Sequence, residues 1–357
     1  MSTEEEQRNS IRGPGIFLAQ FIRPEAPYNN LDGLCQWAAS LGYKGVQLPA
    51  WESPSLIDLD QAATSDAYCQ DWLGRLAGHG LELTELNAAL AGQVMGIHPA
   101  YETAFQPFYP EGMSDPERVE WATMELMKTL DAAARLGTGC VPVLSGGLAW
   151  HLMYPWPQRP QGLIEEAFRE MASRWRPVLD HASGLGLRIG YELHPGSDLF
   201  DGYTFERFLH ELDGHPAIAL NYDPSHMVLQ GMDYLEFIRL YGDRIAGFHV
   251  KDAELRPNGK GGAYGGYLGW AQRPGRFRSL GDGQVDFKSV FTLLTEAGYR
   301  GWAVLEWECA VKSPEQGAAE GAPFIMSHLI EMSSVAFDDF AGGDSDQQLN
   351  RRILGLE

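Results

Sequence analysis

Three stretches of the chain end an apolar run with side chains of the kind that bind metals: RIGYELHP (188–195), IALNYDPSH (218–226) and IAGFHVKD (245–252). A fourth stretch, GWAVLEWE (301–308), repeats the pattern closer to the C-terminus. Short apolar runs that are buried on both faces are typical of strands in a parallel sheet. If these runs are neighbouring parallel strands, their carboxyl ends meet at one edge, and the polar side chains meet there too.

The rest of the chain alternates strand and helix signals. Four earlier apolar runs predict strands at 15–21, 45–50, 81–90 and 139–145. Helices are expected at 31–41, 60–77, 114–136, 163–183, 204–212, 233–241, 286–297 and 323–336. Eight alternating strand–helix units predict an α/β fold, a single (β/α)8 TIM barrel with long loops at its C-terminal face.

A doubly wound open sheet is the alternative to the barrel. Such sheets usually carry a glycine-rich turn after the first strand. This chain has FIRPEAPYNN (21–30) there, which favours the barrel. We expect a flexible segment at 1–14, the catalytic barrel at 15–340 and a tail at 341–357, with a glycine-rich loop near 253–283.

Charge and cysteine content limit the class of protein. The formal net charge of −21 argues against nucleic acid and anionic membranes, because both need clustered Lys and Arg. No apolar run approaches the roughly 18 residues that a membrane span requires. The polar start MSTEEEQRNS and four scattered cysteines predict reduced thiols and a cytoplasmic location.

Four side chains at the ends of the last four runs are the candidate metal ligands: Glu192, Asp223, His249 and Glu306. Two Glu, one Asp and one His form an oxygen-rich set that suits a hard divalent cation. Each residue has a simpler explanation, since a single Glu often caps a strand end and Asp223 could only form a turn. Their coincidence on four successive strands favours the metal site. Glu306 is preferred to Glu308 because it lies deeper in its strand.

Several neighbours of these ligands have two open interpretations. Lys251 and Asp252 could support the ligands or could only form ion pairs, and Lys251 is also a candidate substrate contact. His194 could bind substrate or pack in a loop, and His226 could act in the site or cap a helix.

The predicted site implies a type of chemistry. A cation beside a carbonyl polarises it, and a nearby carboxylate can then remove the proton on the adjacent carbon. Return of the proton gives epimerisation or isomerisation, and loss of a β-substituent gives elimination. The same four ligands serve all three outcomes, so the ligands do not choose among them.

Loop residues indicate the substrate. Aromatic side chains follow strands two, three and four, among them Trp51 and Trp150, and we expect Trp51, Trp150 and His151 to contact a sugar. These rings could instead fill gaps beneath long loops. The segment 255–280 holds five basic residues and no acidic one, which is consistent with a lid, a subunit contact or recognition of an anion.

The motifs E-L-H-P, D-P-S-H, H-V-K-D and L-E-W resemble those of the xylose isomerase-like barrel family of sugar isomerases and epimerases. The resemblance implies that Glu192, Asp223, His249 and Glu306 bind Mn²⁺, Mg²⁺ or Co²⁺. It implies that Glu192 and Glu306 move the proton and that His226 helps to hold the substrate. For the family's substrate-binding arginine, Arg256 is only a candidate. Endonuclease IV shares the fold but is a poor match in charge and in histidines.

Three functions are therefore in competition. The first is a metal-dependent sugar isomerase or epimerase. The second is a lyase or dehydratase that acts on a keto sugar, an inosose or a 3-keto-(C-)glycoside, as the resemblance to inosose dehydratases and C-glycoside-cleaving enzymes implies. The third is a non-catalytic sugar-binding barrel. A homo-oligomer, a dimer or tetramer, is expected, with a subunit of a hetero-complex as the alternative.

Overall fold

Eight parallel strands form one sheet in the computed structural model, which describes residues 10–331 and 346–356. The strands are β1 (Arg12–Phe17), β2 (Gly45–Pro49), β3 (Glu82–Asn87), β4 (Cys140–Val143), β5 (Arg188–Glu192), β6 (Ile218–Tyr222), β7 (Ile245–Val250) and β10 (Trp302–Leu305). Their order is β3-β2-β1-β10-β7-β6-β5-β4. At the remaining seam, the Ala88 amide donates to the Pro142 carbonyl at 2.8 Å. The sheet is thus a nearly closed TIM barrel, as the sequence predicts.

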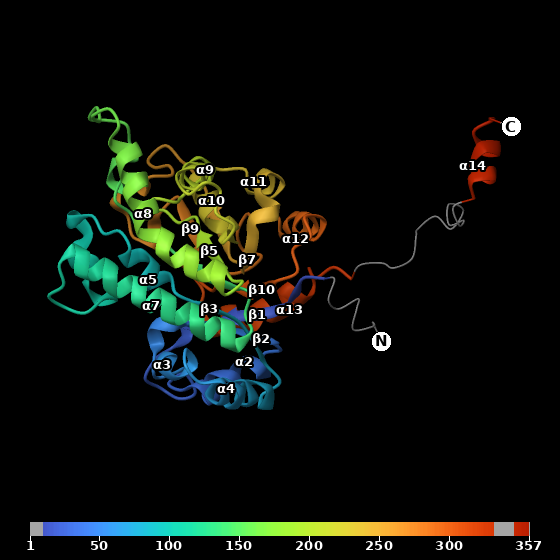
Figure 1. Ribbon diagram of the computed structural model, residues 1–357, viewed down its shortest axis with the longest axis horizontal. Coiled ribbons are helices and arrows are strands. Elements are labelled where there is room, and N and C mark those ends of the chain that lie inside the picture. Colours follow the sequence, from blue (N-terminus) through green and yellow to red (C-terminus); the bar gives the residue numbers. More distant parts are fainter. Residues whose placement is uncertain (1–9, 332–345, 357) are drawn as a thin grey trace.

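Helices surround the strands (Figure 1). They are α2 (Leu31–Ser40), α3 (Leu59–Ala62), α4 (Asp66–Gly78), α5 (Ala89–Val94), α6 (Glu102–Phe105), α7 (Asp115–Leu136), α8 (Leu163–Gly184), α9 (Gly202–Glu211), α10 (Pro224–Gln230), α11 (Tyr234–Tyr241), α12 (Phe287–Glu296) and α13 (Pro314–Met326). A further helix, α14 (Gln347–Ile353), is the last element of the chain. Every residue of β2, β6 and β7 is buried, as expected for strands that lie between a filled barrel interior and outer helices.

Local signals set the helix ends. The backbone amide of Ser114 donates to the Glu117 carboxylate at 2.8 Å, which fixes the start of α7 where the sequence predicts it. The expected helix 60–77 is two helices, because Ser65 accepts a hydrogen bond from the Tyr68 amide and starts α4 anew.

The last predicted helix is misplaced at 323–336. Helix α13 begins at Pro314, because Ser313 accepts from the Gln316 amide and proline suits the first turn. Pro323 lies inside that helix rather than at its start. Residues 332–336 of the prediction lie outside the described part of the chain.

The segment 253–283 is not only a loop. It contains an antiparallel hairpin of β8 (Asp252–Leu255) and β9 (Gly275–Arg278). The hairpin follows β7 directly and therefore begins beside the predicted ligand His249.

No helix within 10–331 and 346–356 has the length and hydropathy to cross a membrane. The boundaries expected at residues 14 and 340, the cytoplasmic location and the oligomeric assembly stay predictions.

Candidate metal centre

The four predicted ligands converge. One ligand atom from each of Glu192, Asp223, His249 and Glu306 lies within 4.8 Å of those from the other three, and all four side chains are almost fully buried. Glu192 ends β5, Asp223 follows β6, His249 lies in β7 and Glu306 follows β10. These strands are hydrogen-bonded neighbours. The parallel register therefore brings residues that are distant in sequence to one rim of the barrel.

The imidazole of His249 lies between two carboxylates. Its Nδ1 atom is 3.0 Å from Glu192 Oε2 and 3.1 Å from Glu306 Oε2. Burial opposes ionisation of Glu192, but hydrogen bonds from His226 and His249 outweigh burial and hold its pKa well below the ordinary value. Burial also opposes a charge on His249, but Glu306 and Glu192 raise the His249 pKa well above its ordinary value.

Asp223 has the least stable charge of the group. Burial and the nearby carboxylates of Glu192 and Glu306 raise the pKa of Asp223 to about 8, against the opposing effect of Lys251. Its Oδ2 atom is buried and accepts no hydrogen bond. A buried oxygen without a donor, beside two further carboxylates and an imidazole, fits the coordination chemistry of a divalent cation. The residues present therefore fit the metal that the family resemblance implies.

Lys251 forms ion pairs with the rim of this group. Its Nζ atom lies 2.8 Å from Glu308 Oε2, 3.1 Å from Glu306 Oε2 and 3.6 Å from Asp223 Oδ2. Burial opposes the lysine charge, but Glu306 and Glu308 outweigh it and raise the Lys251 pKa well above the ordinary value. Burial opposes ionisation of Glu306, but Lys251 and His249 outweigh burial and lower the pKa of Glu306 to about 2.

Asp252 acts elsewhere. Its carboxylate accepts hydrogen bonds from the backbone amides of Gly281 and Gly283, both at 2.9 Å, and of Val285 at 3.2 Å. The side chain therefore holds the turn that follows β9, and the sequence could not distinguish this role from support of the metal ligands.

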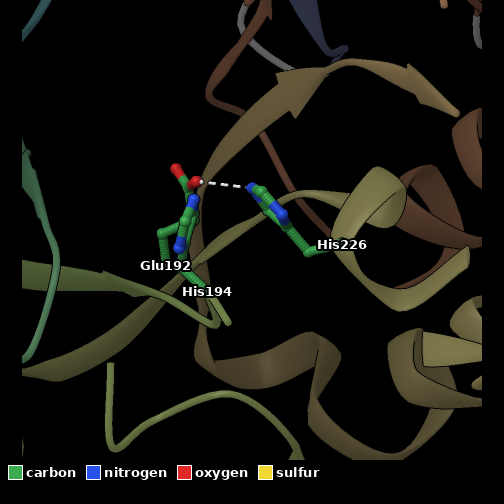
Figure 2. A group of neighbouring side chains, drawn as sticks. All are labelled: Glu192, His194 and His226. Atoms are coloured by element: carbon green, nitrogen blue, oxygen red, sulfur yellow. Dashed lines mark hydrogen bonds and ion pairs between the residues drawn. The ribbon is translucent and has the colours of Figure 1, made fainter. Parts of the chain in front are cut away.

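Two histidines adjoin Glu192 (Figure 2). His226 Nε2 lies 3.1 Å from Glu192 Oε1, and the rings of His194 and His226 are 4.2 Å apart. Burial, followed by His194 and Lys251, lowers the pKa of His226 to about 3, so this buried imidazole is neutral. His194, His226 and Glu192 also have ligand atoms within 4.8 Å of one another. The predicted substrate-contacting histidines therefore lie directly beside the predicted base.

Asn221 is a member of the site that the sequence interpretation missed. Its Nδ2 atom donates to Glu192 Oε2 at 2.9 Å and lies 3.1 Å from His249 Nδ1. A Cβ atom at Gly247 would come within 2.3 Å of Asn221 Oδ1, so glycine leaves the room that the amide occupies. An amide inside the apolar run IALNY was the available signal, because a buried amide needs partners.

Trp51 approaches the centre through one intervening ring. Phe17 stacks on His249 with 5.9 Å between ring centroids, and Trp51 contacts Phe17 edge-on at 6.1 Å. Trp51 also lines a cavity of about 540 Å³. Phe108 and Tyr109, from the loop after β3, line the same cavity. None of the four candidate metal ligands lines it.

Three further predicted substrate contacts have their interactions elsewhere. Trp150 contacts Phe200 edge-on with 5.2 Å between ring centroids, and the tilted rings of His151 and His98 have centroids 3.7 Å apart. Arg256 binds Glu254 at 2.6 Å, and its side chain is 67% exposed. Their role toward a substrate stays a prediction.

Curated inosose dehydratases are similar to this chain in sequence. The relative from Geobacillus thermodenitrificans is 32% identical over 148 residues, 41% of this chain and 49% of that protein. The relative from Bacillus licheniformis is 30% identical over 186 residues, 48% of this chain and 61% of that protein. The alignments thus span about half the length of these relatives.

Solved structures share the fold at low identity. A 3-keto-D-glucoside 4-epimerase from E. coli superposes with a TM-score of 0.60 at 13% identity, covering 88% of this chain and 98% of that one. A xylose isomerase-like TIM barrel protein from Mycobacterium smegmatis in complex with magnesium superposes with a TM-score of 0.61 at 16% identity, covering 92% of this chain and 98% of that one. A sequence model described as xylose isomerase-like TIM barrel matches residues 35–328. The chain belongs to the xylose isomerase-like TIM barrel family.

Proposed function

We propose that the protein is a metal-dependent enzyme that removes the proton next to the carbonyl of a polyhydroxylated ketone, a keto sugar or an inosose. The single observation that carries the proposal is the convergence of four ligand atoms within 4.8 Å at the carboxyl ends of neighbouring strands. Glu192, Asp223, His249 and Glu306 would hold the ion. When bound, a divalent cation supplies positive charge beside the substrate carbonyl and so acidifies the adjacent C–H bond.

Glu192 is the proposed base. Its carboxylate is kept ionised by hydrogen bonds, and it lies at the site rim beside two imidazoles. His226 holds Glu192 Oε1 at 3.1 Å and so fixes the direction of the carboxylate. His194, partly exposed, donates from Nδ1 to the Pro195 carbonyl at 2.6 Å, so its Nε2 atom can accept a hydrogen bond from a substrate hydroxyl on the same side. Proton removal and hydroxyl recognition are thus assigned to one side of the centre.

Loss of a β-hydroxyl, a dehydration, is the favoured outcome. The curated relatives described above are inosose dehydratases. A departing hydroxyl needs a proton donor, and the Glu192 carboxyl group becomes one once it has taken the C–H proton.

Epimerisation or isomerisation is the second candidate. Glu306 is a second carboxylate, and it approaches His249 Nδ1 from β10 while Glu192 approaches from β5. Two carboxylates that reach a substrate from different strands are the arrangement needed to remove a proton on one face and return it on the other.

Incubation of the Mn²⁺-loaded protein with inosose and a panel of neutral ketoses in D₂O tests the proposal. Loss of water, read by mass spectrometry, supports dehydration. Recovery of an epimer or isomer that carries deuterium supports the second candidate. Exchange and turnover should both disappear in Glu192→Gln. Turnover that continues unchanged in this variant would contradict the assigned base, and a protein that neither exchanges nor converts any of these ketones would contradict the function.

A further inference from the structure

A chain of buried amides reaches His249 from the side opposite the carboxylates. Gln47 of β2 and Asn87 of β3 are 1% and 2% exposed, and Glu85 of β3 is 4% exposed. Polar side chains are rarely buried without a hydrogen-bonding role. These residues take no part in the chemistry described above, so the reason for their burial must be sought in what they contact.

The direction of every hydrogen bond in this chain follows from one backbone donor. The Ala89 amide can only donate, and it lies 2.9 Å from Asn87 Oδ1. Asn87 therefore presents its Nδ2 group to Gln47, whose Oε1 atom accepts at 3.0 Å. With Gln47 Oε1 so placed, Gln47 Nε2 must face Glu85 Oε2, which accepts at 3.1 Å. An oxygen of Glu85 can accept in either protonation state.

His249 completes the chain. Its Nε2 atom lies 3.0 Å from the same Gln47 Oε1 atom, which accepts and does not donate. The proton of neutral His249 must therefore sit on Nε2, which leaves the Nδ1 lone pair directed at Glu192 and Glu306. Asn221 Nδ2, a donor 3.1 Å from His249 Nδ1, is compatible with that lone pair.

We infer that Asn87, Gln47 and Glu85 are positioning residues, which fix the tautomer and ring orientation of His249 so that Nδ1 is available to a metal ion. The inference rests on the proposed function, since it assigns a purpose to a ligand of that centre. It extends the site from the barrel rim into β2 and β3, strands that supply none of the four ligands.

The isosteric change Asn87→Asp tests the inference. The new carboxylate oxygen would face Gln47 Oε1 and repel it, so the Gln47 amide would reverse and present its Nε2 group to His249. His249 could then accept only at Nε2, and its proton would move to Nδ1, where the ion binds. We expect Mn²⁺ affinity, measured by titration calorimetry, to fall about 10–100-fold, the range found when partners of metal-binding histidines are removed.

A matched variant serves as the control. Gln93→Glu makes the same amide-to-acid change at another buried side chain, 3% exposed, whose Oε1 accepts from Ser197. Its Mn²⁺ affinity should be retained. Circular dichroism reports whether each variant is folded.

The tautomer itself can be read without any variant. In two-bond ¹H–¹⁵N spectra of the Zn²⁺-loaded wild-type protein, the His249 proton should appear on Nε2. A proton on Nδ1, or an Asn87→Asp variant that binds Mn²⁺ as tightly as the wild type, would overturn the inference and leave the proposed function intact. A wild-type protein that binds no ion would overturn the proposed function as well.

Discussion

Two charge clusters, one around Glu254 in the β8–β9 hairpin and the other at the metal centre, differ in kind. In the hairpin, Glu254 accepts from Arg256, Arg276 and Arg278 at 2.6, 2.7 and 2.8 Å. Burial opposes ionisation of Glu254, but hydrogen bonds from Arg276 and Arg278 outweigh it and lower its pKa. Every oxygen of that carboxylate has a cationic donor, so the cluster has no place for a further cation.

The metal centre has the opposite balance. Carboxylates outnumber cations, the pKa of Asp223 is raised to about 8 by burial and neighbouring carboxylates, and Asp223 Oδ2 has no donor. A carboxylate whose two oxygens both have cationic donors stabilises structure, whereas a cluster with surplus negative charge and an oxygen that accepts no hydrogen bond is prepared for a ligand. The comparison therefore separates the two clusters.

The largest effect is expected for Asp223→Asn. The substitution removes a charged ligand but keeps the shape, so Mn²⁺ affinity should fall by more than about 100-fold in titration calorimetry, beyond the effect of losing an outer partner. Glu254→Gln is the matched control in the hairpin. It should leave Mn²⁺ affinity unchanged and lower the free energy of unfolding, because three guanidinium groups lose a buried partner. Equal Mn²⁺ affinities of the two variants would remove the distinction between the clusters.

The pH dependence of ion binding is the second prediction. The pKa of His249 is raised well above its ordinary value and that of Asp223 to about 8, so both side chains carry protons near neutrality. A metal ion requires both to be deprotonated, and binding must release protons. Mn²⁺ affinity should therefore rise from pH 6 to pH 8, by about tenfold per pH unit for each proton released. A flat profile over this interval would show that the ion binds elsewhere.

Lys251→Met should shift affinity in the other direction. The Lys251 ammonium lies 3.1 Å from Glu306 Oε2 and competes with a cation for that oxygen. Its removal should tighten Mn²⁺ binding by about fivefold or more, since a unit charge at this distance is worth at least about 1 kcal/mol. Arg278→Met in the hairpin should leave the affinity as it is. Weaker binding by Lys251→Met would mean that the lysine supports the ligands instead.

The smallest effect is expected for Gly247→Ala. The added methyl group would come within 2.3 Å of Asn221 Oδ1 and displace the amide that holds Glu192. Mn²⁺ affinity should fall several-fold, less than for loss of a ligand, because Glu192 itself remains. Gly74→Ala, where a Cβ atom meets nothing within 4 Å, is the control. Identical affinities of the two variants would show that Asn221 does not position the carboxylate.

The sequence was sufficient for the barrel and for the convergence of its four candidate ligands. Strand ends are readable because burial on both faces produces continuous apolar runs, and parallel strands must place their carboxyl ends on one rim. The sequence alone therefore predicts one site formed by Glu192, Asp223, His249 and Glu306.

The remainder depended on contacts between distant segments. Glu254 lies one residue outside the basic segment 255–280. Its ion pairs with Arg276 and Arg278 of that segment form only when the hairpin folds. The polar residues Gln47 and Asn221 stand alone inside apolar runs, and their partners come from other strands. The last helix is predicted at 323–336, whereas the Ser313–Pro314 pair starts α13 at Pro314 and Pro323 lies inside it.

A crystal of the protein soaked with Mn²⁺ tests the central claim most directly. An anomalous difference map should show a peak roughly 2.0–2.4 Å from a side-chain atom of each of Glu192, Asp223, His249 and Glu306, with His249 contributing Nδ1. A map with no peak among these four side chains, at an Mn²⁺ concentration that saturates the protein in solution, would contradict the account.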